Sequence, residues 1–168
     1  MTIKPFFLKT TYILSLLFAF SLCISKAYSY QNNTYFVTAV HDGDTISVLD
    51  KNNKLARIRL LFIDAPELDQ PYGYNSKKAL SDLIFNRIIS ANCPQIDSYG
   101  RQLCEIHLNG ININEALLTN GHAWVYRYFS RNLELIRLED KAKQNRVGLW
   151  ALQGDQIIPP WIWRKGDH

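Results

Sequence analysis

The sequence predicts an α+β fold, in which a five-stranded OB-fold-type β-barrel packs against about three helices. β-branched and aromatic residues dominate residues 34–62, a helical pattern follows from Ser76, and a hairpin and a second helical region come after it. Strands first, with a helix between the third and fourth strands, is the order of a small Greek-key barrel. The chain has 168 residues, of which 47% are hydrophobic and 20% charged, so it can form one domain with its own core.

The first 29 residues have the features of a secretory signal peptide. Lys4 and Lys9 precede an apolar run at residues 12–24, and the small residues Ala27 and Ser29 occupy the cleavage positions. The run is shorter than the roughly 20 residues that a spanning helix needs, so a permanent N-terminal anchor is the less favoured alternative. We therefore expect a mature domain at residues 30–168 that is secreted or periplasmic and has no stable membrane association.

Charge composition does not identify a partner. The whole chain carries a net charge of +4, but the predicted signal peptide contains three lysines and no acidic residue. The mature domain is therefore close to neutral, and its overall charge is no evidence for nucleic-acid binding. Nor do its histidines and cysteines have the spacing of a zinc site.

The barrel strands are expected in two groups. Residues 34–62 predict three strands in a meander, with a turn at residues 50–53. Residues 88–107 predict a hairpin that turns at residues 97–100. Cys93 and Cys104 are placed symmetrically about that turn, so in a hairpin they face each other. A disulfide between them and a pair of buried free thiols are both compatible with the sequence.

Three helical segments are expected around the barrel. The first begins near Ser76, and the second is a short helix with Asn114 as its N-cap and Gly121 as its stop. A short strand at residues 122–128 precedes the third helix, at residues 133–146. We expect residues 159–164 to be non-helical, because they begin with two prolines, and to pack back on the domain through their aromatic side chains.

Two acidic motifs suggest a metal site. Asp42-Gly43-Asp44-Thr45 taken alone is most simply a tight turn. Asp64-Ala65-Pro66-Glu67 follows a strand of apolar residues, which would place Asp64 at the rim of the sheet. Carboxylate and carbonyl oxygens suit hard cations such as Ca²⁺, and a site with few protein ligands stays open for water and a phosphate oxygen.

Two arginines add the complementary charge. Arg59 lies on the strand that leads to Asp64, and Arg101 follows the turn Asp97-Ser98-Tyr99-Gly100. A guanidinium group can donate two hydrogen bonds to a phosphate and stays charged at any working pH. Each arginine alone would more often be a surface ion-pair partner, but together with the acids the pair favours phosphodiester hydrolysis.

The motifs in this order resemble the staphylococcal nuclease family, also called thermonucleases or micrococcal nucleases. The resemblance covers residues 35–164. It rests on Val40-His41-Asp42-Gly43-Asp44-Thr45, Arg57-Ile58-Arg59-Leu60, Ile63-Asp64-Ala65-Pro66-Glu67, Asp97-Ser98-Tyr99-Gly100-Arg101, Asn114-Glu115-Ala116-Leu117 with Gly121, Gly148-Leu149-Trp150 and Pro160-Trp161-Ile162-Trp163-Arg164.

The resemblance implies roles for the metal-site residues. Asp44 and Asp64 would bind Ca²⁺ together with the carbonyl oxygen of Ala65, and Asp42 would support these ligands without touching the metal. Glu67 would be the general base or would orient the attacking water. The implied activity is cleavage of DNA and RNA, preferably single-stranded, at the bond to the 5′-oxygen, by a monomer that leaves 3′-phosphates.

The arginines and tyrosines would handle the substrate. The resemblance makes Arg59 and Arg101 the phosphate and transition-state clamps and gives Tyr99 a phosphate contact. Where the family prototype has a lysine beside that tyrosine, this chain has Ser98. Tyr126 and Tyr128 could stack on bases, or could be ordinary strand aromatics.

Two other functions use the same fold or the same residues. A nucleic-acid or protein binding module that has lost catalysis would lack one of the acids or arginines, and here all five remain. A phosphodiesterase acting on small nucleotides would use the same groups and stays open.

Overall fold

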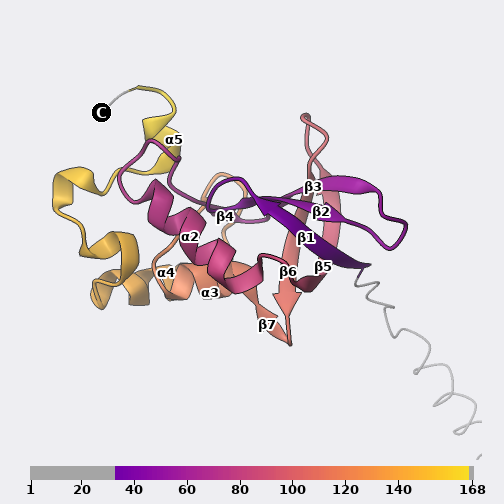
Figure 1. Cartoon of the computed structure of the whole chain (residues 1–168). Coiled ribbons are helices and arrows are strands. Elements are labelled where there is room, and N and C mark those ends of the chain that lie inside the picture. The colour runs from indigo at the N-terminus through magenta and orange to yellow at the C-terminus, as the bar shows by residue number, and fades with distance from the viewer. Residues whose placement is uncertain (1–32, 167–168) are drawn as a thin grey trace, which may run out of the picture. The chain divides into compact units, whose positions relative to one another are not determined.

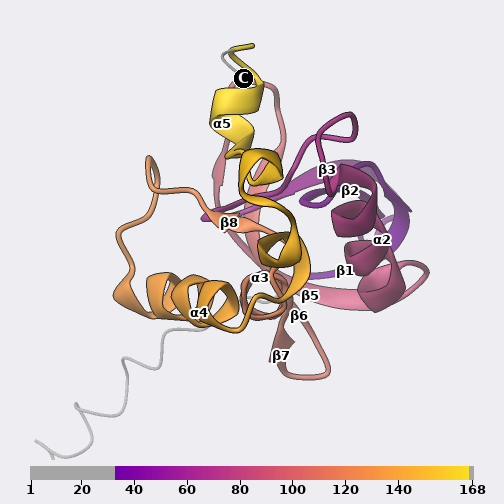
Figure 2. The same ribbon diagram turned by 90° about the vertical axis from the view of Figure 1, so that its left-hand side faces the viewer.

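The computed structural model describes residues 33–166, and the elements within this range are shown in Figures 1 and 2. The predicted signal peptide, residues 1–29, lies outside the described residues. Within residues 33–166, no helix combines the length and the apolar character needed to cross a membrane.

Five strands form a closed barrel, as the sequence predicted. In spatial order they are β3, β2, β1, β5 and β6, and a parallel pairing of β3 with β6 closes the ring. The residues that face the interior alternate along each strand, so that Val37, Ile46, Val48 and Ile58 are completely buried. The strands are β1 (Asn33–Val40), β2 (Thr45–Leu49), β3 (Leu55–Leu60), β5 (Ile88–Ile96) and β6 (Gln102–Leu108).

Three short strands extend this plan. β7 (Ile111–Asn112) pairs with the end of β6 after a tight turn, so the chain does not leave the sheet at Gly110. β4 (Ile63–Asp64) and β8 (Trp124–Val125) form a separate two-stranded sheet. The strand expected at residues 122–128 is therefore shorter than predicted, and its role is to hold Asp64.

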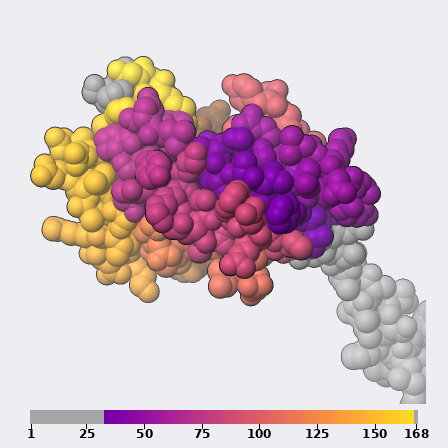
Figure 3. Space-filling model, viewed as in Figure 1, coloured from indigo at the N-terminus to yellow at the C-terminus, as the bar shows by residue number. Residues whose placement is uncertain are grey.

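Within residues 33–166, four α-helices lie beside the barrel, one more than the three expected as distinct helices. They are α2 (Gly73–Ile84), α3 (Ile113–Thr119), α4 (Leu133–Gln144) and α5 (Pro160–Trp163). Two 3₁₀ turns, η2 (Gly148–Ala151) and η3 (Gly154–Gln156), join α4 to α5. In Figure 1 the helices gather on one side of the barrel strands. The space-filling view shows the surface of α2 between the first strands and the C-terminal residues (Figure 3).

Two predictions about helix ends were wrong. Pro160 does begin a short helix, α5, because a proline at the first helical position needs no hydrogen-bond partner for its missing N–H. The N-cap of α3 is Asn112, whose side chain accepts a hydrogen bond from the backbone N–H of Glu115. The sequence offered two asparagines two residues apart, and the pattern alone did not distinguish them.

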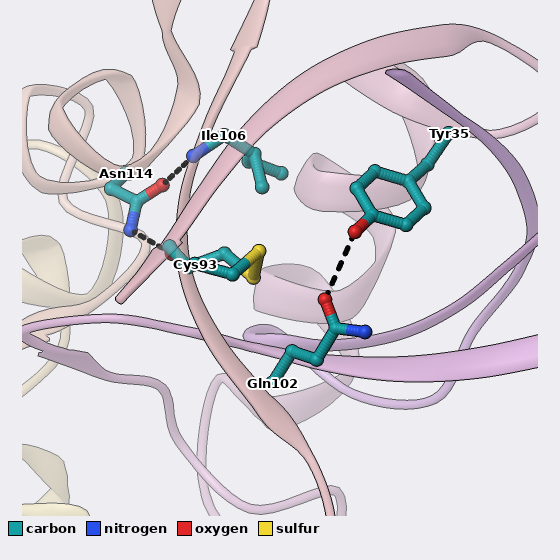
Figure 4. Close-up of a disulfide and its surroundings, with 6 residues drawn as sticks. Tyr35, Cys93, Gln102, Ile106 and Asn114 are labelled. Atoms are coloured by element: carbon teal, nitrogen blue, oxygen red, sulfur yellow. Dashed lines mark hydrogen bonds between the residues drawn. A yellow bond between two sulfur atoms is a disulfide. The ribbon is translucent and has the colours of Figure 1, made fainter. Parts of the chain in front are cut away.

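Asn114 instead joins three parts of the core. Its buried amide accepts a hydrogen bond from the N–H of Ile106 and donates to the carbonyl oxygen of Cys104, both at 3.1 Å (Figure 4). It also donates to the carbonyl oxygen of Leu61 at 3.0 Å. A buried amide with its hydrogen bonds satisfied fixes the elements around it. Here it ties α3 to β6 and to the turn that follows β3.

The β5–β6 hairpin carries a disulfide. Cys93 and Cys104 are joined with an S–S distance of 2.05 Å, so of the two states that the sequence left open, the structure has the bridged one (Figure 4). Close by, the hydroxyl of Tyr35 donates to the side chain of Gln102 at 3.0 Å. These links brace the hairpin, whose tip contains residues 97–101.

The C-terminal segment is fastened to the loop that follows β4. The indole N–H of Trp163 donates to Asp69 at 3.2 Å, and the side-chain amide of Gln70 donates to the carbonyl oxygen of Ile158. The ring of Trp161 packs edge-on against Trp124 of β8. Arg164, the residue after α5, is thereby held beside residues 64–67.

Candidate active site

The loop between β1 and β2 is shaped by Asp42 and Gly43. One carboxylate oxygen of Asp42 accepts the N–H groups of Asp44 and Thr45, at 2.9 and 2.7 Å. A Cβ on Gly43 would lie 2.0 Å from Ser76 Oγ, on α2. Glycine is therefore needed here for close packing, and not for a left-handed backbone, and the loop presses Asp44 toward residues 64 and 65.

Asp44, in the loop before β2, and Asp64, on β4, converge. Asp44 accepts the backbone N–H of Ala65 at 2.7 Å, and Asp64, on β4, is 1% exposed. Arg59 bridges the two carboxylates, with Nε 3.1 Å from Asp44 Oδ1 and a terminal nitrogen 2.8 Å from Asp64 Oδ1. The structure thus brings together the two acids that the sequence placed in one metal site.

The chemistry of these donors fits a hard cation. Burial raises the pKa of Asp44 to about 8, although the charge of Arg59 lowers it, and the charges of Asp42 and Asp64 raise it further. A divalent cation would replace the proton that this carboxyl holds at neutral pH. Hard cations such as Ca²⁺ take six to eight oxygen ligands, so two aspartates and a carbonyl oxygen would leave positions for water and substrate.

Most of the N–H groups of Arg59 are bound by other groups of the protein. Besides the two carboxylates, it donates to the carbonyl oxygens of Leu60 and Ile63, both at 2.8 Å. A guanidinium has five N–H groups, so these contacts leave one for a substrate. Its side chain is 13% exposed. Arg59 therefore holds the carboxylates in place at least as much as it can hold a phosphate.

Arg101 is far less engaged. Its Nε donates to Asp97 at 2.8 Å, and its guanidinium lies 5.4 Å from the ring centre of Tyr99. Asp97 also accepts the backbone N–H groups of Tyr99 and Arg101, which fixes the turn at the hairpin tip. The remaining N–H groups of Arg101 make no hydrogen bond within the described chain, so they are available to a phosphate.

Arg164 is a site residue that the sequence reasoning missed. It donates to both carboxylate oxygens of Asp64, at 2.7 and 3.2 Å, and to Glu67 at 2.7 Å. These hydrogen bonds raise the pKa of Arg164, those to Asp64 most. Residues 160–164 carried part of the family resemblance, but nothing in the motif indicated that its arginine reaches across the fold to the acids.

One cavity of about 530 Å³ collects nearly all of the predicted residues. Arg164 and Phe129 line it as well. The predicted residues that line it are Asp42, Asp44, Arg59, Asp64, Ala65, Glu67, Tyr99, Arg101 and Tyr126. Acids and arginines therefore face a common space large enough for a nucleotide.

The two candidate stacking tyrosines differ. Tyr128 does not line the cavity and is 83% exposed. Tyr126 does line it, but one face of its ring is covered by Trp161, with ring centres 5.9 Å apart and nearly parallel. Phe129 contacts both tyrosine rings edge-on and lines the cavity, a position that the sequence pattern did not reveal.

Comparison with known proteins decides the family. Residues 57–152, more than half of the chain, match the family model described as "Staphylococcal nuclease homologue". The chain belongs to the staphylococcal nuclease family. This membership confirms the resemblance seen in the motifs and supports a nuclease function in general.

Several curated members of the family are similar over most of their length. An "Uncharacterized endonuclease" of Haemophilus influenzae is 36% identical over 90% of this chain and 83% of its own length. One of the same description from Escherichia coli O157:H7 is 40% identical over 76% of this chain and 82% of its own. A "Micrococcal nuclease" of Shigella flexneri is 34% identical over 77% of this chain and 79% of its own.

Proposed function

We propose that the protein is a secreted, Ca²⁺-dependent endonuclease that hydrolyses DNA and RNA at the bond to the 5′-oxygen and leaves 3′-phosphates. The observation that carries the proposal is the convergence of Asp44 and Asp64 on Arg59, in the same cavity as Glu67 and Arg101. Phosphodiester hydrolysis needs a charge-neutralising group, a base for water and cationic donors for the phosphate. The cavity provides residues for each of these.

In this proposal the acids divide the work. Asp44, Asp64 and the carbonyl oxygen of Ala65 would hold the cation, which supplies Lewis-acid polarisation of the phosphate when bound. Glu67 takes a proton from a water whose oxygen bonds to phosphorus, while the bond from phosphorus to the 5′-oxygen breaks and that oxygen gains a proton. One oxygen of Glu67 is bound by Arg164, which orients the carboxylate, and the other makes no hydrogen bond within residues 33–166.

The arginines also divide the work. Arg101 donates to the non-bridging oxygens of the phosphate, where negative charge increases in the transition state. Arg59 keeps Asp44 and Asp64 side by side and has one N–H left for the phosphate. The sequence treated the two arginines as equal clamps, and we now assign most of the phosphate contact to Arg101.

Aromatic side chains around the cavity support a single-stranded substrate. Tyr99 is 84% exposed at the hairpin tip, and Phe129 and Tyr126 line the cavity near α5. Unpaired bases stack on such faces without being read for sequence. In this proposal Tyr128 contacts only bases that lie outside the cavity. The enzyme acts as a monomer.

Export is the remaining part of the proposal. Residues 1–29 have the pattern of a signal peptide, and a disulfide such as Cys93–Cys104 persists in oxidising compartments outside the cytosol. Mass spectrometry of the protein recovered from cell fractions tests this directly. We expect a chain that begins near residue 30 in the periplasm or the medium, and a full-length chain retained in the membrane would contradict it.

Digestion of long single-stranded DNA and RNA tests the activity. The protein should cut both with calcium and neither with a chelator, and end-group analysis should find 3′-phosphates and 5′-hydroxyls. Arg101→Ala is the matched control, because it should be inactive yet folded. Binding without cleavage would indicate a binding module, and hydrolysis restricted to small diesters would indicate a nucleotide phosphodiesterase.

A further inference from the structure

A second, smaller cavity adjoins the first. It measures about 260 Å³ and is lined by Asp42, Thr45, Arg57, Tyr99 and Arg101. Four of these five also line the larger cavity, so the two cavities are neighbours that share part of their walls. Among the described residues that line the smaller cavity, Arg57 is the one that the larger cavity lacks.

Arg57 is held by the barrel but unpaired. It lies on β3 opposite Ser47 and two residues before Arg59, on the side of the strand away from the buried Ile58. Its side chain makes no hydrogen bond or ion pair within residues 33–166, whereas Arg59 donates three hydrogen bonds and makes a further ion-pair contact with Asp44. A rigid strand therefore presents a free guanidinium at the edge of the active-site cavity.

The rest of the small cavity also suits an anion. Arg101 uses only Nε within the described chain, so its outer N–H groups can serve both cavities. Asp42 is an opposing charge here, but its Oδ1 is already bound by two backbone N–H groups. The hairpin tip before Arg101, residues 97–100, contributes no cation of its own.

We propose that Arg57, together with the outer side of Arg101, forms a subsite for the phosphate next to the one that is cleaved. This inference rests on the proposed nuclease function, because it assumes that the larger cavity holds the scissile phosphate. A nucleic-acid strand that runs from the larger cavity into the smaller one would place one phosphate at Arg101 and the next phosphate at Arg57. The subsite makes the enzyme favour substrates with at least two phosphates over a bare dinucleotide.

Dinucleotides with and without one extra terminal phosphate test the subsite. With calcium, the wild-type protein should hydrolyse the dinucleotide that carries a 5′- or a 3′-terminal phosphate with kcat/KM about tenfold higher than the unmodified dinucleotide. In Arg57→Ala this ratio should fall close to one, and in Arg57→Lys it should be intermediate. If the additional phosphate raises kcat/KM only at the 5′ end or only at the 3′ end, the result gives the direction in which the nucleic-acid strand is bound.

Arg87→Ala is the matched control, because Arg87 is an exposed arginine that lines neither cavity. It should keep the wild-type ratio. A ratio near one for the wild type at both ends, or an unchanged ratio in Arg57→Ala, would overturn the subsite.

A binding measurement separates this inference from the proposed function. Fluorescence anisotropy with labelled dinucleotides, in a chelator so that nothing is cut, should show tighter binding when the extra phosphate is present, and Arg57→Ala should remove that gain. If no variant hydrolyses nucleic acid but this pattern holds, the nuclease proposal fails, while binding of the additional phosphate by Arg57 is supported. If hydrolysis proceeds but the gain persists in Arg57→Ala, the subsite fails and the nuclease stands.

Discussion

Replacing Arg59 by alanine should lower the free energy of unfolding by about 3–5 kcal/mol, the usual cost of removing one partner from a buried ion pair. Arg59 makes buried ion-pair contacts with Asp44 and Asp64 and also binds two carbonyl oxygens. In the variant Arg164 still compensates Asp64, and Asp44, whose pKa burial raises to about 8, is protonated at pH 7. The expected loss of stability therefore comes from the buried polar groups that Arg59 no longer binds.

Arg101 provides the comparison. Its side chain is 27% exposed and, among residues 33–166, forms an ion pair with Asp97 alone, so Arg101→Ala should cost at most about 1 kcal/mol. Both variants should lose activity, because both remove positive charge from the cavity. The two arginines should therefore differ in how much they contribute to the free energy of unfolding, while both are required for turnover.

Urea denaturation in the presence of a chelator, monitored by tryptophan fluorescence, measures the stability lost in Arg59→Ala and in Arg101→Ala. Since a domain of this size is stabilised by only about 5–15 kcal/mol, Arg59→Lys serves as a milder second variant that keeps the charge but loses part of the bridging. It should fall between the wild type and Arg59→Ala. An Arg59→Ala protein within 1 kcal/mol of the wild type, or one no less stable than Arg101→Ala, would refute this reasoning.

Three further outcomes are expected. Because the pKa of Asp44 is raised, the metal-free folded protein holds a proton on this carboxyl that the unfolded chain releases above pH 3.8. The free energy of unfolding should therefore fall as the pH rises from about 4 to 8, by up to about 1.4 kcal/mol per pH unit. Thermal melts in a chelator check this, and stability that rises over that range would contradict it. Arg164→Ala should lower kcat/KM on single-stranded DNA at least tenfold, with Arg164→Lys restoring only part, because lysine cannot bridge Asp64 and Glu67; wild-type kinetics in Arg164→Ala would exclude a positioning role. Replacing Cys93 and Cys104 together by serine should cost about 3 kcal/mol, and a wild-type protein whose denaturation midpoint is insensitive to reductant would show that the bridge does not contribute.

The alternation of apolar residues predicted the strands, and the order of the elements together with the family resemblance predicted the barrel. Ile46 and Val48 on one strand, and Ile58 and Leu60 on the next, are two residues apart, as the inward-facing positions of a strand must be, and all four are buried. The family resemblance carried by the motifs also placed Asp44, just before β2, and Asp64, on β4, in one site. Local patterns succeeded where the outcome depends on local geometry.

The failures concern contacts between distant segments. Asn114 has the residue type of an N-cap, and only the packing of α3 against β6 decides that its amide is buried. From the sequence, Gly43 is a typical turn glycine, but glycine is required at this position because the side chain of Ser76 leaves no space for a Cβ atom. Arg164 lies 100 residues from Asp64 in sequence, so no spacing rule could assign it to the site.

A crystal structure of the protein with calcium and a dinucleotide that carries a non-hydrolysable linkage tests the central claim most directly. The account predicts that the cation is bound by Asp44 and Asp64, and that the phosphate lies between this cation and Arg101. A cation bound elsewhere, or a phosphate out of reach of both Arg101 and the two aspartates, would contradict it.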